Sequence, residues 1–122
     1  MKRSKSFRDL IVWQKAHQLV LDIYEMNLCL PENEKYGISN QIKRSSVSVP
    51  ANIAEGFGRI STKEKLRFFY IANGSLEETR YFLILINDLK FTQTEQLQKK
   101  LTEVSKILNS YISRIKNEHN DK

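Results

Sequence analysis

The sequence is poor in residues that break helices or cross-link a chain. Among its 122 residues are 4 glycines, 2 prolines and a single cysteine, Cys29. One cysteine excludes a disulfide within the chain and fits a reducing compartment, so we expect a cytoplasmic protein. Because glycine and proline mark most tight turns, their scarcity favours long helices joined by short connections.

Long apolar runs are also absent from the sequence. No stretch approaches the ~20 apolar residues needed to cross a bilayer, and no apolar segment follows the basic start of the chain, Met1–Ser6. We therefore expect neither a secretory signal nor an association with membranes. Hydrophobic residues make up 40% of the chain and charged residues 28%, which is typical of a folded protein. The length suits one buried core, so we predict a single domain over residues 1–122.

Apolar residues recur at helical spacing in four segments. We predict helices over about residues 9–30, 34–57, 62–89 and 93–116. The last segment has the clearest stripe: Leu97, Leu101, Val104, Leu108, Tyr111 and Ile115. No segment alternates with the period of two that is typical of strands. Four such helices with short connections predict an all-α fold, an antiparallel up-and-down four-helix bundle.

Capping residues and breakers mark the expected helix ends. Three pairs have the spacing of a capping box, in which a hydroxyl caps the helix and a carboxylate reaches back: Ser6 with Asp9, Ser61 with Glu64, and Thr92 with Glu95. Pro31 should end the first helix, because the residue before proline avoids the helical region. The polar tail from Lys116 to Lys122 is expected to fray.

Two residues that disfavour helices lie inside predicted ones. Pro50 lies in the second helix, where an interior proline costs ~3 kcal/mol. It allows either two short helices or one kinked helix, and the apolar period stays in phase across it, which favours one helix kinked at Pro50. Gly74 lies in the third helix and costs ~1 kcal/mol relative to alanine. We therefore expect another helix to approach closely at Gly74.

The residues that build most active sites are too few or wrongly spaced. Neither His17 nor His119 follows a glutamate by three residues, as a di-metal bundle site requires, and one cysteine cannot supply a zinc site. The Gly-Phe-Gly segment at 56–58 is too short for a phosphate-binding loop and should instead end the second helix. Cys29 lies several turns from His17, so we expect a buried structural thiol rather than a nucleophile. The sequence predicts no enzyme, no cofactor and no metal site.

Positive charge is in excess. The chain has 20 Lys and Arg against 14 Asp and Glu, a net charge of +6 that would attract polyanions. The candidate nucleic-acid-binding residues lie on the second helix and around the start of the third: Lys43, Arg44, Arg59, Lys63 and Arg67. The alternative is a solvated face with local ion pairs. The neighbouring aromatic residues are expected to belong to the core rather than to stack on bases: Phe57, Phe68 and Tyr70.

Apolar side chains exceed what a four-helix core can cover. The surplus residues are Trp13, Tyr24, Tyr81, Phe82 and Ile112. Uncovered apolar patches mark interaction sites, so we expect a homo-oligomer. The same surplus supports an alternative function, a protein-interaction scaffold with no role in nucleic-acid binding.

Four segments of the sequence together form one set of motifs. They are FRDLIVWQKA at 7–16, EKYGI with QIKRS at 34–45, SVPANIAEG at 48–56 and IANGSLEE at 71–78. In order and spacing they resemble the four-helix-bundle proteins encoded in intervening sequences of bacterial 23S ribosomal RNA genes. These proteins are related to the accessory proteins of diversity-generating retroelements. The resemblance covers about Phe7 to Leu108; one mild departure is the pair Ser45-Ser46, where relatives often carry two alanines.

The resemblance implies a bundle that assembles into a pentameric ring, with RNA or DNA and a reverse transcriptase as partners. By position, Lys43, Arg44 and Arg59 match basic residues of the family. Five further motif residues should make packing and polar contacts between the second and third helices: Asn52, Glu55, Gly74, Ser75 and Glu78. Charge and resemblance together predict a non-enzymatic homo-oligomer that binds nucleic acid, or serves a nucleoprotein as an accessory factor, through a basic surface.

Overall fold

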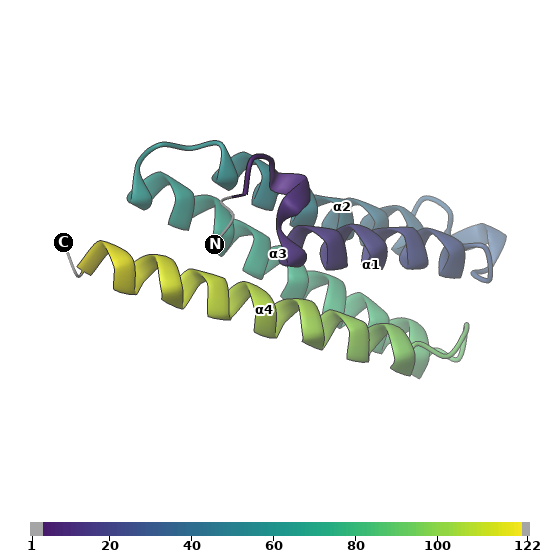
Figure 1. Ribbon diagram of the computed structural model, residues 1–122. Helices are drawn as coiled ribbons and strands as arrows, with labels where there is room; N and C mark the ends of the chain where they lie inside the picture. Colours follow the sequence, from purple (N-terminus) through teal and green to yellow (C-terminus); the bar gives the residue numbers. More distant parts are fainter. Residues whose placement is uncertain (1–3, 121–122) are drawn as a thin grey trace.

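Four long helices lie side by side in the computed structural model, which describes residues 4–120 (Figure 1). Two short 3-10 turns, η1 and η2, precede α1 and α2, and no strand forms within the described residues. The bounds are Phe7–Asp9 for η1, Ile11–Asn27 for α1, Glu32–Glu34 for η2, Ile38–Phe57 for α2, Thr62–Asp88 for α3 and Glu95–Asn120 for α4. Each helix contacts the next, and α4 contacts α1, which closes the bundle. The predicted all-α, up-and-down four-helix bundle is confirmed.

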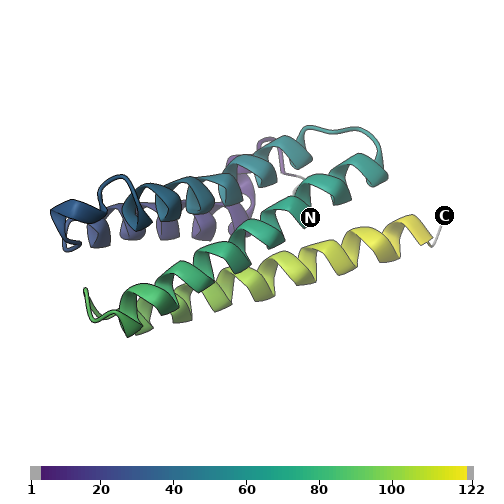
Figure 2. The same cartoon turned by 180° about the vertical axis from the view of Figure 1, so that it is seen from behind.

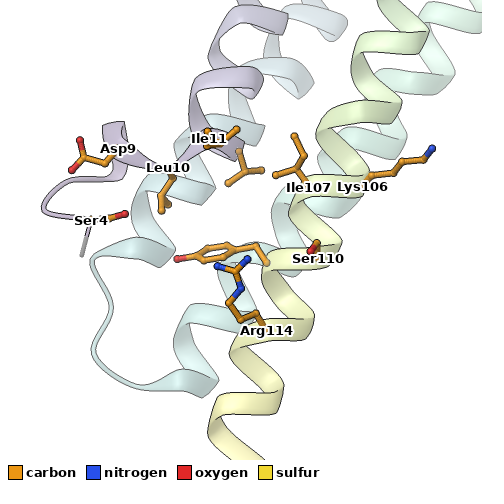
Figure 3. A pocket seen from close by; sticks show the side chains of 10 residues that line it. Ser4, Asp9, Leu10, Ile11, Lys106, Ile107, Ser110 and Arg114 are labelled. Carbon is orange, nitrogen blue, oxygen red and sulfur yellow. The ribbon is translucent and has the colours of Figure 1, made fainter. Parts of the chain in front are cut away.

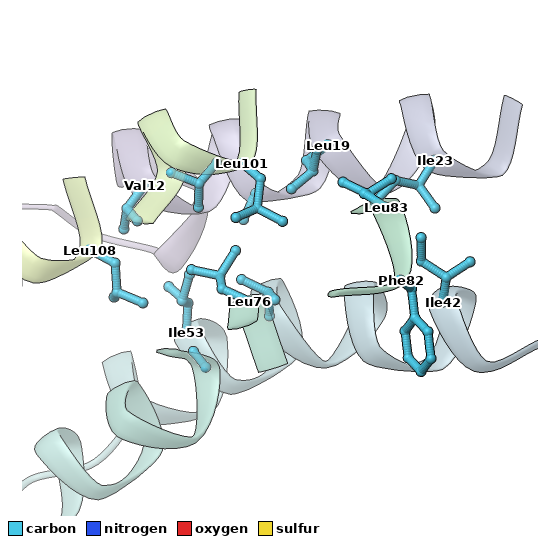
Figure 4. Packing of buried hydrophobic residues seen from close by; sticks show 14 of the residues in the cluster. Val12, Leu19, Ile23, Ile42, Ile53, Leu76, Phe82, Leu83, Leu101 and Leu108 are labelled. Atoms are coloured by element: carbon cyan, nitrogen blue, oxygen red, sulfur yellow. The ribbon is translucent and has the colours of Figure 1, made fainter. Parts of the chain in front are cut away.

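The core is built from the predicted apolar stripes, which meet along the axis of the bundle (Figure 4). Burying one such aliphatic or aromatic side chain contributes ~1.5–3 kcal/mol, so these stripes supply the main driving force for folding. Fully buried members are Ile23, Ile42, Ile53, Phe69, Leu76, Leu83, Ile86, Leu101 and Leu108. Phe82 and Ile112 are only 9% and 5% exposed, so their assignment to a surplus outside the core was wrong.

The two ends of the bundle differ. The α2–α3 connection and the end of α4 lie at one end, whereas the α1–α2 and α3–α4 connections lie at the other (Figures 1 and 2). Helix α1 has 17 residues, against 27 in α3 and 26 in α4. At 1.5 Å per residue, α1 is therefore about 15 Å shorter than α3. The turn before it, η1, contacts both α1 and α2.

The first capping box closes η1 rather than α1. The backbone N–H groups of Lys5 and Ser6 donate to Asp9 Oδ2 at 2.9 and 3.1 Å, and Ser6 Oγ accepts from the backbone N–H of Arg8 at 3.2 Å. Leu10 is then extended, so α1 begins at Ile11 instead of residue 9. It ends at Asn27 because the three residues before the proline form hydrogen-bonded turns.

Helix α2 starts later than predicted and runs unbroken past its proline. Residues 32–34 form η2, and α2 begins after Gly37. Pro50 is buried inside α2, so the alternative of two short helices is wrong, and the kink at Pro50 stays a prediction.

Helix α3 begins as its sequence indicates, whereas α4 does not. Ser61 Oγ accepts from the backbone N–H of Glu64 at 3.1 Å. Helix α4 begins at Glu95, so the predicted cap at Thr92 was wrong. Thr94 precedes the helix instead, and its buried hydroxyl donates to the carbonyl of Leu83 at 2.6 Å. Residues 116–120, which were expected to fray, are helical, and residues 121–122 of the predicted tail lie outside the described range.

Close packing between helices occurs at Gly56 and not at Gly74. A Cβ atom built on Gly56 would lie 2.7 Å from Cε1 of the Phe69 ring, closer than real contacts allow. Around Gly74, which is exposed, no heavy atom of the described residues would lie within 4 Å of such a Cβ, leaving aside the neighbouring backbone of its own helix. The expected close approach at Gly74 was therefore wrong. The close approach between α2 and α3 occurs at Gly56.

Candidate nucleic-acid interface

The five predicted basic residues form two groups in the structure. Arg59, Lys63 and Arg67 lie at the α2–α3 end of the bundle, since Arg59 follows α2 and the other two lie in the first two turns of α3. Lys43 and Arg44 lie in the second turn of α2. Lys43 is 14 residues from the last residue of α2, which at 1.5 Å per residue is about 21 Å.

The two arginines of the first group share one aromatic ring. The guanidinium carbons of Arg59 and Arg67 lie 4.8 and 5.1 Å from the centroid of Phe68. Arg59 Nη2 also donates to Glu55 Oε2 at 3.1 Å, and Arg67 Nε lies 4.0 Å from Glu64 Oε2. These ion pairs are solvent-exposed, so each is worth ~0–1 kcal/mol and can exchange for another anion.

Helix α4 adds a fourth cation, Lys116, from a segment that the sequence predicted to fray. Lys63 and Arg67 are four residues apart and share a face of α3, and Tyr70 follows one turn later. Lys116 Nζ lies 5.4 Å from the centroid of Tyr70. We call this group the basic end: Arg59, Lys63, Arg67 and Lys116.

The aromatic residues at the basic end were wrongly expected to be core. Phe57 and Phe68 are half-buried, and Tyr70 is 46% exposed. A planar guanidinium held over a ring keeps its edge N–H groups free for a phosphate, so these rings can orient the cations. Cations and aromatic rings also occur side by side in proteins that bind single-stranded nucleic acid.

Lys65, in contrast, has a structural role. Its Nζ donates to the carbonyl of Phe57 at 2.8 Å and to that of Gly56 at 3.4 Å, so it satisfies the C-terminal carbonyls of α2. Burial lowers the pKa of Lys65. The side chain ties the start of α3 to the end of α2, beneath the basic end.

Lys43 and Arg44 point to different neighbours, as adjacent helical residues must. Lys43 Nζ lies 5.2 Å from the ring centroid of Tyr24 on α1. Arg44 lines a polar pocket of about 470 Å³ between α2 and α3, which we call the polar cleft. Its other lining residues are Tyr36, Asn40, Gln41, Ser45, Ser48, Ser75 and Glu78.

The motif residues expected between the second and third helices have mixed roles. Ser75 Oγ donates to Ser48 Oγ at 2.8 Å across the α2–α3 interface, and Glu78 lines the polar cleft beside it. Asn52 bonds within its own helix, since its Nδ2 donates to the carbonyl and hydroxyl oxygens of Ser48. Glu55 belongs to the basic end instead, through its ion pair with Arg59.

Comparison with known proteins decides the family. A family model described as 23S rRNA-intervening sequence protein matches residues 8–110.

The chain belongs to the 23S rRNA-intervening sequence proteins.

A solved structure agrees with this assignment. It is a 1.70 Å crystal structure of a protein of unknown function from the S23 ribosomal protein family of Bacteroides thetaiotaomicron VPI-5482. The two chains are 29% identical and align with a TM-score of 0.77, over 84% of this chain and 98% of the other. No curated protein matches this 23S rRNA-intervening sequence protein. The resemblance seen in the sequence motifs is thereby confirmed.

Two residues considered as catalytic or metal-binding candidates, Cys29 and His17, both lie at the surface. Cys29 is exposed, so its assignment as a buried thiol was wrong. His17 is at the surface, with its ring stacked on Trp13 at 4.9 Å between centroids. Within residues 4–120, no three His, Cys, Asp or Glu side chains gather closely enough to hold a metal ion. In the same range, no helix combines the length and apolar character needed to span a membrane.

A second pocket of about 430 Å³ lies where α1 begins (Figure 3). Leu10, Ile11 and Ile107 give it apolar walls, and Arg114 lies at its edge. The ring of Tyr111 also lines it, and burial raises the pKa of this phenol.

Exposed apolar residues on α1 and α2 form a strip. Leu21, Tyr24 and Leu28 follow one another at helical spacing and are 49%, 44% and 85% exposed. Val47, which is 40% exposed, lies one turn after Lys43, whose ammonium lies over Tyr24. We call these four residues the apolar strip. Of the apolar surplus predicted from the sequence, Tyr24 and Tyr81 are exposed and Trp13 is half-buried.

Proposed function

We propose that this protein is a non-enzymatic homo-oligomer that binds nucleic acid through the basic end. The observation that carries the proposal is that four cations lie at this end of the bundle: Arg59 and Arg67 over Phe68, Lys116 over Tyr70, and Lys63 one turn before Arg67 on α3. Lysine and arginine contribute affinity by displacing the counterions of phosphates, and this term does not depend on nucleotide sequence. The net charge of +6 adds long-range attraction for the same ligands.

The ion pairs at the basic end do not oppose this proposal. Glu55 and Glu64 offset part of the charge of Arg59 and Arg67, but all four side chains are substantially exposed. Exposed pairs are held weakly, whereas a phosphate accepts two charge-assisted hydrogen bonds from one guanidinium. A polyanion that spans the basic end therefore competes effectively with these carboxylates.

A titration of labelled RNA and DNA over a series of salt concentrations tests the proposal. The logarithm of the binding constant should fall linearly with the logarithm of salt concentration. Replacing Arg59, Lys63 and Arg67 by glutamine should reduce this slope by about 2 for single strands and about 3 for duplexes, at ~0.7 and ~0.9 per lost contact.

A matched variant controls for net charge. Lys90, Lys99 and Lys100 lie at or near the opposite end of the bundle, and replacing them by glutamine removes the same three charges. This variant should keep nearly the full slope. Equal losses in the two triple variants would show that binding follows net charge and not the basic end. No binding of RNA or DNA even at low salt would remove the proposal.

The oligomer is proposed from the apolar strip. Contiguous apolar surface of this kind is costly in water and is normally covered by a partner. We expect light scattering to give a mass several times that of the chain, and replacing Leu21 and Leu28 by serine to lower it. Ile60, which is 99% exposed in the α2–α3 connection, provides a control serine variant that should not change the mass. A monomer mass at micromolar concentration would contradict the proposal, and the pentamer implied by the resemblance stays a prediction.

The apolar strip also favours the second candidate function, a scaffold for another protein. Co-purification of one stoichiometric protein that survives nuclease treatment, without nucleic-acid binding in the salt series, would favour the scaffold. Loss of that protein on nuclease treatment would instead favour a nucleoprotein accessory factor.

A further inference from the structure

The polar cleft has the volume of a ligand site and an unusually polar lining. Its volume of about 470 Å³ lies within the range of small-molecule pockets, ~300–1,000 Å³. Most such pockets are apolar, whereas every residue that lines this one has a polar side chain. The cleft therefore suits a ligand that is polar along its whole length.

Hydroxyl groups with fixed hydrogen bonds form the floor of the cleft. Ser45 Oγ lies 2.8 Å from Thr79 Oγ1, and both residues are buried. Ser48 Oγ accepts from Ser75 Oγ at 2.8 Å and from Asn52 Nδ2 at 2.9 Å. Because Ser48 Oγ already accepts twice, its own hydrogen remains to donate to a ligand. The bonds hold the floor in place before any ligand arrives.

Two opposite charges line the cleft without neutralising each other. Arg44 comes from α2 and Glu78 from α3, and among the described residues neither is within ion-pair distance of an opposite charge. A guanidinium binds a phosphate through paired N–H groups, and a carboxylate accepts from hydroxyl or amino groups. A guanidinium and a carboxylate that line one cleft suit a ligand that carries both an anionic group and hydrogen-bond donors.

An aromatic ring stands at the rim. Tyr36 is 85% exposed in the turn before α2, although it lines the cleft. A base that stacks on such a ring removes apolar surface of both from water. Asn40 and Gln41 belong to the first turn of α2, so the positive end of the helix dipole adds to the attraction of Arg44 for an anion.

We propose that the polar cleft binds a nucleoside monophosphate unit, with its phosphate on Arg44, its sugar hydroxyls or base amino group on Glu78, and its base against Tyr36. The unit is either a free nucleotide or one residue of a single strand. The cleft lies on the α2–α3 face, about 20 Å along α2 from the basic end, so it is a separate site from that of the proposed function.

A titration of the full-length, ¹⁵N-labelled protein with AMP, GMP, CMP and UMP tests the site by NMR. Shifts should gather at residues 40–48 and 75–78, and uridine and ribose 5-phosphate should each bind more weakly than UMP by tenfold or more. Inorganic phosphate that binds as tightly as UMP would overturn the proposal, because the cleft would then hold an anion only. Absence of shifts at the cleft with millimolar nucleotide would also overturn it.

Variants of exposed residues separate the three contacts without threatening the fold. Arg44→Gln should weaken UMP at least tenfold and leave uridine unchanged, whereas Glu78→Gln should weaken both. Tyr36→Leu should weaken all four nucleotides while sparing ribose 5-phosphate. Lys43→Gln and Glu77→Gln are matched controls, since Lys43 lies over Tyr24 and Glu77 pairs with Arg80. Equal losses in the controls would overturn the assignment.

Two further binding measurements distinguish the polar cleft from the basic end. The triple variant of Arg59, Lys63 and Arg67 should lose affinity for long strands but keep its affinity for UMP. Loss of UMP in that variant, with the cleft variants unaffected, would place the nucleotide at the basic end and overturn the inference. A short single strand that displaces UMP from the cleft identifies a strand residue as the ligand, and a strand that leaves UMP bound identifies the free nucleotide.

Discussion

Replacing Gly56 by alanine should destabilise the protein, whereas the same change at Gly74 should stabilise it. Both glycines lie inside helices, so alanine gains ~1 kcal/mol of helix propensity at each position. At Gly56 the new Cβ would lie 2.7 Å from Phe69 Cε1, and that ring is fully buried. Forcing extra volume into a filled core costs ~1–3 kcal/mol, which leaves a net loss of up to ~2 kcal/mol.

At Gly74 nothing opposes the gain. The exposed position leaves the new Cβ in open space among the described residues, so the ~1 kcal/mol of propensity should appear in full. For a chain of 122 residues this raises Tm by about 4 °C. Denaturant unfolding followed by circular dichroism measures both variants, at one protein concentration because oligomers unfold in a concentration-dependent way.

A double variant isolates the cause. Phe69→Leu replaces the ring by a smaller side chain and should remove most of the penalty of Gly56→Ala. The two changes should therefore couple favourably by ~1–2 kcal/mol. Equal stabilisation by alanine at both glycines would refute the reasoning, because it would show that the Phe69 ring yields freely. Destabilisation by Gly74→Ala would show that another chain covers this face of α3.

Two other perturbations test specific contacts. Thr94→Val should cost ~1–3 kcal/mol in the free energy of unfolding, because it removes both hydrogen bonds of the buried hydroxyl, the one to the Leu83 carbonyl and the one from Gln98 Nε2, and Thr94→Ser should recover most of this loss. Asp22→Asn should reduce the loss of stability in acid. Burial raises the pKa of Asp22, but hydrogen bonds from Lys100 and Gln18 outweigh it and the net pKa is lowered. The stabilisation by this carboxylate is therefore present above its unfolded pKa of ~3.9 and is lost as pH falls through the lower folded value. Unfolding curves from pH 7 to pH 2 measure the difference, and parallel curves for the two proteins would contradict it.

The helices and the core could be predicted because each depends on a local period. Stripes of apolar residues identify the buried faces without knowledge of which helix they meet. Helix ends depend on contacts that the sequence does not contain. Thr92 and Thr94 are equivalent as capping residues, and the carbonyl of Leu83 makes Thr94 the buried one.

The candidate site was only partly predictable for the same reason. Charge composition and local spacing located Lys63 and Arg67 on one face, but Lys116 joins them through the packing of α4 on α3. Gly56 and Gly74 both carry a helix penalty, and only the distance to the Phe69 ring reveals which one a neighbour requires. The polar cleft combines two segments more than 25 residues apart, which the contacts of Ser48 and Ser75 bring together.

The bonds that Lys65 makes to the last carbonyls of α2 determine how the basic end meets a ligand. They join the end of α2 to the start of α3, while Arg59 and Arg67 lie over the ring of Phe68. A surface that is ordered before an encounter loses little conformational entropy when it binds. For the proposed binding of nucleic acid, the association rate should therefore be governed by charge and diffusion, and not by the slower folding of a loop around the ligand.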